Sequence, residues 1–220
     1  MAINKFHWIL DAGHGAINLT QLTTNSTHIN GKIITSGKRS FKFPKGNQYA
    51  NQCLIEGVVN REVLNYLTLL LAAENIKFSV LVPTFKDISL TARCTLANAI
   101  AKNSNLPCIL VSIHHNAFRN EWNAAKGVSS HYFKKGDRYS TAGKQYAEDF
   151  QKELVINSGL RDRGIKGNNF KMLRDTSMPA ILTENGFMTN LVEAEYLMTE
   201  IGKQNTAKGH FTAIKNIELN

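Results

Sequence analysis

The stretch CILVSIHHNA, residues 108–117, indicates the fold more clearly than any other part of the chain. Its continuous apolar start is typical of a strand in a parallel sheet that helices cover on both faces. Other β-rich runs alternate with segments of helical periodicity. The β-rich runs are residues 6–11, 78–82, 127–133, 170–173 and 180–184, and the helical segments are residues 56–74, 89–103, 140–157 and two more at the end of the chain. This order predicts an α/β fold with a mostly parallel, roughly six-stranded twisted sheet between helices.

Length and composition predict a single domain over residues 1–220, because no internal repeat, low-complexity tract or linker-like run divides the chain. The formal net charge of +9 favours an acidic partner. The basic residues are spread along the chain, and no nucleic-acid recognition motif is present. The charge is compatible with an anionic lipid or with the phosphates and carboxylates of a cell envelope and does not choose between them, whereas we do not expect nucleic acid as a partner.

The N-terminus lacks the features of a secretory signal. Its apolar stretch at residues 6–10 is too short for the hydrophobic region of a signal peptide. The longest later apolar run, residues 67–73, is too short to span a bilayer. These features predict a soluble protein that is made in the cytoplasm without a signal peptide. Cys53, Cys94 and Cys108 have no paired spacing, which favours free thiols over disulfides or cysteine metal ligands.

The segment between His14 and Glu56 breaks the alternation of strands and helices. Positions 15 to 55 make 41 residues, rich in Thr, Asn, Lys and Gly, and a loop of that length is uncommon unless it has a function. We interpret about residues 16–52 as an inserted loop that borders the substrate groove, with a β-hairpin expected over residues 32–43 and its turn near residues 36–37. Its basic residues could contact anionic groups of a partner, or they could belong to a merely solvated hairpin. These residues are Lys32, Lys38, Arg39, Lys42 and Lys45.

Three candidate metal ligands stand where strands and helices meet. His14 follows the first strand between two glycines, Glu56 opens the first long helix, and His114 ends the strand of residues 108–114. The carboxyl ends of parallel strands share one edge of a sheet, where ligands bind. Two imidazoles and a carboxylate make a three-ligand zinc set that leaves one position open. Glu184 ends the last strand and would project onto the same edge.

Each of these residues also has a structural explanation. A histidine between glycines can serve a turn, and a glutamate in the first turn of a helix is favoured by the helix dipole. Strand alternation must send His114 and His115 to opposite faces, so only one of the two can join the site. Glu184 could be an ordinary turn carboxylate.

Taken together, these residues lie in motifs that resemble those of the zinc-dependent N-acetylmuramoyl-L-alanine amidases of the amidase-3 type. DAGHG at residues 11–15 resembles the family's Asp-Pro-Gly-His-Gly, and Glu56 with Asn60 resembles its Glu-x-x-x-Asn helix start. SIHHNA at residues 112–117 resembles Ser-Ile-His-Ala-Asn-Ala, which puts His115 at an alanine position. MPAILTENGFMTN at residues 178–190 is close to Pro-Ala-Val-Leu-Val-Glu-x-Gly-Phe-x-x-Asn. A Leu-x-x-Arg-x-x-x-Ala-Asn segment is matched by Leu90, Arg93, Ala97 and Asn98.

The resemblance spans residues 9 to about 190, with departures that touch no proposed ligand. Ala12 replaces the usual proline, residues 81–83 lack the arginine of the family's Leu-Thr-Arg, and the segment after His14 is much longer than typical. The longer segment puts the substrate contacts in doubt, since it would lie beside the zinc.

The resemblance implies that His14, Glu56 and His114 hold one zinc ion per chain and that Glu184 is the general base. The implied reaction is hydrolysis of the amide bond between N-acetylmuramic acid and the L-alanine of the stem peptide in bacterial peptidoglycan. Asn116 is a candidate substrate contact, and so is Arg174.

Two other functions remain as alternatives. A zinc carboxypeptidase acting on stem peptides usually needs a His-x-x-Glu pair, and Ile17 stands where that glutamate would be. A catalytically inactive wall-binding module tends to lose ligands or the base, whereas all four candidates are present here. The implied setting is a phage endolysin that reaches the wall through a holin lesion, a sporulation enzyme freed by lysis, or a toxin with a dedicated export route.

Overall fold

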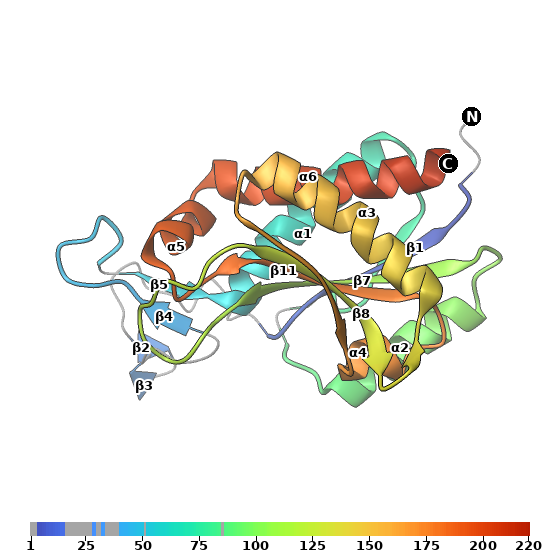
Figure 1. Ribbon diagram of the computed structural model, residues 1–220, viewed down its shortest axis with the longest axis horizontal. Coiled ribbons are helices and arrows are strands. Elements are labelled where there is room, and N and C mark those ends of the chain that lie inside the picture. The colour runs from blue at the N-terminus through green and yellow to red at the C-terminus, as the bar shows by residue number, and fades with distance from the viewer. Residues whose placement is uncertain (1–3, 16–27, 30–31, 34–39, 51, 85) are drawn as a thin grey trace.

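The computed structural model describes residues 4–15, 28–29, 32–33, 40–50, 52–84 and 86–220. A seven-stranded sheet forms the centre of the molecule, with strand order β10-β8-β11-β7-β1-β6 and β9 paired to the outer part of β8 (Figure 1). The strands are β1 (His7–Ala12), β6 (Phe78–Val80), β7 (Cys108–Asn116), β8 (Val128–Lys135), β9 (Arg138–Tyr139), β10 (Asp162–Asn168) and β11 (Ala180–Phe187).

Most neighbouring strands of this sheet are parallel. The pairs β1–β6, β1–β7, β7–β11 and β8–β10 run parallel, whereas β8 is antiparallel to β11 and to β9. The predicted mostly parallel α/β sheet is therefore confirmed. Strand β7, which includes most of the CILVSIHHNA stretch, lies between β11 and β1 and is buried along most of its length.

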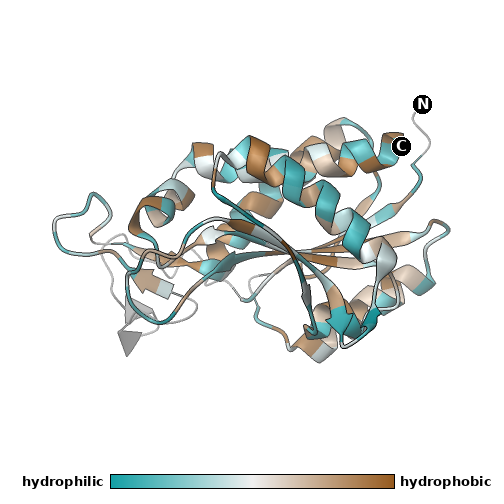
Figure 2. Ribbon diagram, in the orientation of Figure 1, coloured by the Kyte–Doolittle hydropathy of each residue, from teal (hydrophilic) through white to brown (hydrophobic). Residues whose placement is uncertain are grey.

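Helices cover both faces of the sheet. The helices are α1 (Glu56–Ala73), α2 (Leu90–Lys102), α3 (Thr141–Ser158), α4 (Lys171–Arg174), α5 (Leu191–Met198) and α6 (Glu200–Leu219). Helices α1, α3 and α6 lie on one face, and α2 and α4 lie on the other. In Figure 2 the outer turns of α3 are mainly hydrophilic, whereas the central strands are mainly hydrophobic. No helix among the described residues is both long and apolar enough to span a membrane.

The alternation of side chains along each strand produces two cores. On β7, Ile109 and Val111 pack into the core beneath α1, α3 and α6, whereas Leu110 joins the core beneath α2 and α4. Odd-numbered residues of β7 therefore face the first helix layer and even-numbered residues face the second. Near the end of β7, the same alternation places His114 and His115 on opposite faces of the sheet.

One predicted strand forms a helix instead, and one observed strand was not predicted. Residues 170–173 were expected to be a strand, but Lys171–Arg174 form the helical turn α4, in which Met172 and Leu173 are buried against the core of α2. Strand β10, with the sequence DRGIKGN, was not expected because it carries two glycines and little apolar alternation. It forms at the edge of the sheet, where pairing with β8 on one side is sufficient.

The long segment after His14 contains two short antiparallel pairs where the structure describes it. Strands β2 (His28–Ile29) and β3 (Lys32–Ile33) pair with each other, and β4 (Ser40–Lys42) pairs with β5 (Cys53–Ile55). The predicted hairpin over residues 32–43 is therefore wrong, since its two ends pair with other partners. Its expected turn at residues 36–37 lies outside the described residues, as do Lys38 and Arg39.

The last part of this segment is packed against the protein and is not a simple solvated loop. Phe41 and Phe43 are buried, and their ring centroids lie 6.0 and 5.7 Å from that of Trp122. Lys42 and Lys45 are exposed. Because β5 leads directly into α1, this packing also fixes the position at which α1 begins.

Candidate metal centre

His14 is held in an unusual backbone conformation directly after β1. Its φ of 59° lies in the left-handed region, which residues other than glycine rarely adopt. Its carbonyl oxygen accepts hydrogen bonds from Arg61 at 2.8 Å and from Arg93 at 3.1 Å. These two arginines stabilise a turn that directs the imidazole of His14 towards the carboxyl edge of the sheet.

Gly13 leaves room for the second histidine. A Cβ atom at position 13 would lie 2.1 Å from the ring of His114, so no larger residue fits without displacing that ring. The Gly13 carbonyl oxygen accepts a hydrogen bond from Asn60 at 2.9 Å. The sequence predicted a tight turn for this glycine, and the structure adds the close approach of the segments that carry His14 and His114.

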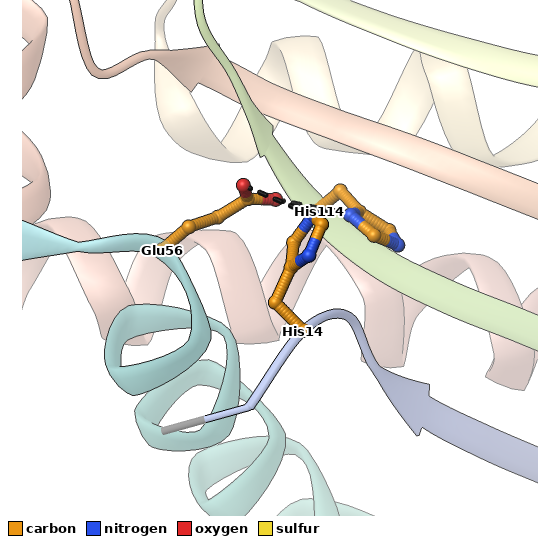
Figure 3. A group of neighbouring side chains, drawn as sticks. All are labelled: His14, Glu56 and His114. Atoms are coloured by element: carbon orange, nitrogen blue, oxygen red, sulfur yellow. Dashed lines mark hydrogen bonds and ion pairs between the residues drawn. The ribbon is translucent and has the colours of Figure 1, made fainter. Parts of the chain in front are cut away.

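Glu56 lies between the two histidines. It is the first residue of α1 and is only 4% exposed. One carboxylate oxygen lies 3.0 Å from His114 Nδ1 and the other lies 3.2 Å from His14 Nε2. The rings of His14 and His114 meet edge to face with their centroids 5.0 Å apart. Figure 3 shows the three side chains converging from β1, α1 and β7.

This arrangement fits a metal ion by its donor set and its spacing. One ligand atom from each of His14, Glu56 and His114 lies within 4.8 Å of the others. Two imidazoles with one carboxylate form the protein part of many catalytic zinc sites, which keep a further position open. The three residues brought together are the three that the sequence predicted as ligands.

The charges in the site favour an anionic Glu56. Burial alone would raise the pKa of Glu56, but the hydrogen bond to His114 and the nearby histidines outweigh it, so the pKa lies below its ordinary value. Burial would in turn lower the pKa of His114, yet the hydrogen bond and the charge of Glu56 raise it.

Glu184 lies beside His114 in the adjacent strand. The register of β11 and β7 places the two residues opposite each other. Burial raises the pKa of Glu184 to about 7, despite the opposing effect of His114. Its Oε2 atom is buried and has no hydrogen-bond partner among the described residues. A cavity of about 280 Å³ connects this carboxyl with the metal-binding set, and it is lined by His14, Glu56, His114, His115, Asn116, Ala117 and Glu184.

A buried ionic network supports the end of β1. Arg93, which is 1% exposed, donates hydrogen bonds to the Asp11 carboxylate and to the Ala12 carbonyl oxygen. The other Asp11 carboxylate oxygen accepts a hydrogen bond from Ser112 at 2.7 Å. The network therefore joins α2, β1 and β7, whose ends carry or adjoin the proposed ligands.

Arg61 supports the candidate site although the sequence gave no sign of it, and the candidate substrate contact Arg174 does not line the cavity. Arg61, on α1, binds the His14 carbonyl oxygen, but its position on a helix gave no signal of that contact. Asn116 lines the cavity as expected, whereas the guanidinium of Arg174 binds Asp175 and Asn169 on the surface. The exposed guanidinium is drawn towards the adjacent carboxylate.

Comparison with known proteins relates nearly the whole chain to one family. The family Amidase_3, described as N-acetylmuramoyl-L-alanine amidase, matches residues 9–216. The N-acetylmuramoyl-L-alanine amidase CwlM of Bacillus licheniformis is 34% identical over 134 residues, which cover 60% of this chain and 48% of that protein. The endolysin of Bacillus phage SPP1 is 34% identical over 111 residues, which cover 50% of this chain and 40% of the endolysin. The chain thus spans less than half of the length of these curated relatives.

Solved structures show the same architecture. An N-acetylmuramoyl-L-alanine amidase from Clostridium difficile 630 matches 97% of both chains with a TM-score of 0.73 and 28% identity. The amidase AmiC2 of Nostoc punctiforme matches 99% of both chains with a TM-score of 0.72 and 21% identity, a level of identity that supports the fold alone.

Proposed function

The chain belongs to the Amidase_3 family of N-acetylmuramoyl-L-alanine amidases, and from this premise we propose that it hydrolyses the amide bond between N-acetylmuramic acid and L-alanine in bacterial peptidoglycan. We further propose that residues 1–220 act as one catalytic domain and that the reaction depends on one zinc ion. One observation carries the proposal. The candidate metal ligands His14, Glu56 and His114 line the same cavity as the carboxyl of Glu184.

His14, Glu56 and His114 would hold the zinc ion. A zinc ion in such a site supplies Lewis-acid polarisation of a carbonyl and a lowered pKa for water. The residues around it keep the ligands in place: Asn60 binds the backbone at Gly13, and the backbone N–H of His115 donates to Glu56 at 3.3 Å. The carboxylate of Glu56 is therefore oriented before the ion binds.

Glu184 would move the proton. Its carboxyl faces the same cavity as the ligand set, and its raised pKa of about 7 suits a group that must accept and then release a proton near neutral pH. As a base it would take a proton from the attacking water, and as an acid it would deliver that proton to the leaving nitrogen of L-alanine. The products are a glycan strand and a free stem peptide with a new amino terminus.

The cell wall is the proposed place of action. The relatives include proteins described as cell wall amidases and an endolysin, and the net charge of +9 would attract anionic wall polymers. In an endolysin setting, wall cleavage would lead to cytolysis.

Digestion of purified sacculi tests the proposed bond. Mass spectrometry of the soluble products should find stem peptides with a free L-alanine amino terminus and an intact glycan. A parallel digestion with Glu184→Gln controls for contaminating hydrolases. New reducing sugar ends, or cleavage confined to bonds within the peptide, would show that the enzyme acts on a different bond.

A further inference from the structure

Polar side chains extend from Glu184 across the face of the sheet that α2 and α4 share. In the antiparallel pair of β8 and β11, Ser129 lies opposite Glu184 and His131 lies opposite Leu182. In the next pair, Lys166 of β10 lies opposite His131. Side chains at paired and next-but-one positions project to the same face of a sheet. Lys166 therefore shares this face with Glu184, two strands away from it.

The groups between these two charges are neutral and satisfied. The ring nitrogens of His131 lie 3.0 Å from Ser129 Oγ and 3.4 Å from Asn168 Oδ1. The His131 ring also packs against Phe170, with centroids 5.5 Å apart. Burial lowers the pKa of His131 to about 4, so the ring is uncharged at neutral pH. Ser129 and His131 are both buried, and they place no competing charge between Glu184 and Lys166.

Lys166 lies on this face of the sheet and can offer its charge to a ligand. Its side chain is partly exposed, and within the part of the chain that the structure describes its ammonium forms no hydrogen bond or ion pair. The neighbouring Arg163 is engaged elsewhere, because its guanidinium lies 4.9 Å from the centroid of the Phe187 ring and donates to the Lys126 carbonyl oxygen. The ammonium of Lys166 is nevertheless close enough to Glu184 for each charge to affect the other.

The proposed reaction gives the substrate a direction. Glu184 must lie within hydrogen-bonding reach of the leaving nitrogen, so the peptide that continues from this nitrogen starts on the Glu184 side of the ligand set. The strand order places β8 and β10 beyond β11 on that side. On the other side, beyond His14, a separate cavity of about 340 Å³ leaves room for the glycan. The stem peptide would then pass over the buried Ser129 and His131 of β8 towards Lys166.

We propose that Lys166 binds a carboxylate of the stem peptide, namely the α-carboxylate of the second residue, and thereby selects substrates in which this group is free and not amidated. The first stem residue, alanine, has no charged side chain. The second residue is a glutamate that is linked to the next residue through its side-chain carboxyl. The α-carboxyl of this glutamate is therefore the first anionic group beyond the scissile bond. This inference rests on the proposed function, because it takes the peptide from that reaction.

Two muramoyl tripeptides that differ only in the α-carboxyl of the second residue test the proposal. We expect wild-type protein to cleave the free carboxylate with a kcat/KM roughly tenfold or more above that for the amide, the scale of one hydrogen bond to a charged group. Lys166→Met should reduce this preference to about unity, mainly by raising KM for the carboxylate substrate. Lys135→Met is the matched control, since Lys135 is an exposed lysine at the far end of β8, and it should keep the wild-type preference.

The pattern of results separates this proposal from other roles of Lys166. If Lys166→Met keeps the preference for the carboxylate substrate, the proposal is overturned. If its kcat also falls equally on both substrates, Lys166 acts through Glu184 instead of binding the substrate. Calorimetry with the two product tripeptides provides a readout that does not need turnover. If wild-type protein cleaves neither substrate, the proposed function fails. The anion site would still be supported if wild-type protein binds the carboxylate peptide more tightly than the amide peptide and Lys166→Met does not.

Discussion

His114 and His115 are neighbours in the chain, yet their imidazoles lie on opposite faces of β7. His114 Nδ1 lies 3.0 Å from Glu56, on the face of the metal-binding set. His115 Nδ1 lies 2.7 Å from the side-chain oxygen of Asn60, beneath α1. Burial lowers the pKa of His115 to about 3, so this ring is neutral. His115 can therefore support the site through Asn60, but it cannot take the place of the proposed ligand His114.

The first prediction follows from this separation of the two rings. His114→Ala should lose bound zinc, whereas His115→Ala should retain one zinc ion per chain with an affinity reduced by roughly tenfold, the usual scale for a residue that supports a metal ligand. Metal analysis and competition with a chromogenic chelator measure both effects. Stoichiometric zinc in His114→Ala together with none in His115→Ala would reverse the assignment.

The second prediction concerns the proton transfer. Glu184→Gln should bind zinc and fold normally but lose at least about a hundredfold in kcat, as expected for a general acid–base residue. Hydrolysis of a soluble muropeptide, followed by chromatography, gives the rate, and circular dichroism checks the fold. A rate near that of the wild type would show that the carboxyl has a structural role only.

The third prediction concerns stability in the absence of metal. The pKa of Glu184 is raised by burial from 4.5 to about 7 in the folded chain. As the pH rises from about 4.5 to 7, the unfolded chain releases this proton first, so the metal-free wild type loses stability over that range. Glutamine does not titrate, and Glu184→Gln should therefore gain stability relative to the wild type up to about pH 7 and then level off.

Thermal unfolding of both proteins in chelator, at several pH values between 4 and 9, measures this difference. A melting-temperature difference that stays constant over the whole range would mean that the carboxyl of Glu184 is well hydrated in solution.

The juxtaposition of His14, Glu56 and His114 could be predicted from the sequence because it depends on local rules. An apolar strand that ends in His114, a glycine turn that carries His14 and a helix that opens with Glu56 all place side chains at the carboxyl edge of a parallel sheet. The strand β10 could not be predicted in this way. Its stability comes from pairing with β8, a contact between distant segments that leaves no period in the sequence itself.

The surroundings of the site were also harder to predict than its ligands. The contact between Arg61 and the His14 carbonyl oxygen joins α1 to a turn 47 residues earlier in the chain. Likewise, the burial of Phe41 depends on Trp122, which approaches it only in the folded protein. The polar composition left open whether this segment borders a groove or forms a solvated hairpin, and it gave no signal of the tertiary packing of Phe41.

The fourth prediction concerns the network behind His14. Arg93→Met should lower the free energy of unfolding by about 3–5 kcal/mol, because it leaves the Asp11 carboxylate buried without its partner. It should also weaken zinc binding, since Arg93 holds the carbonyl oxygen of His14. Urea unfolding of the metal-free proteins measures the first effect. Adding Asp11→Asn should cost much less than in the wild-type background, because the two residues form one network, and full additivity would argue against such coupling.

The last prediction concerns the packed end of the long segment. The ring of Phe41 is fully buried in the main core, and β4 reaches the start of α1 through its pairing with β5. Phe41→Ala should therefore lower the free energy of unfolding by about 3–5 kcal/mol, the usual cost of removing a buried phenylalanine ring. Leu69→Ala is the control, since Leu69 is 69% exposed on α1 and should change stability by less than about 1 kcal/mol. Zinc affinity should fall with Phe41→Ala as well, because β5 leads directly to the proposed ligand Glu56. If Phe41→Ala behaves like the control in urea unfolding, β4 is not docked on the core in solution, and the whole segment could then be shortened without loss of the metal centre.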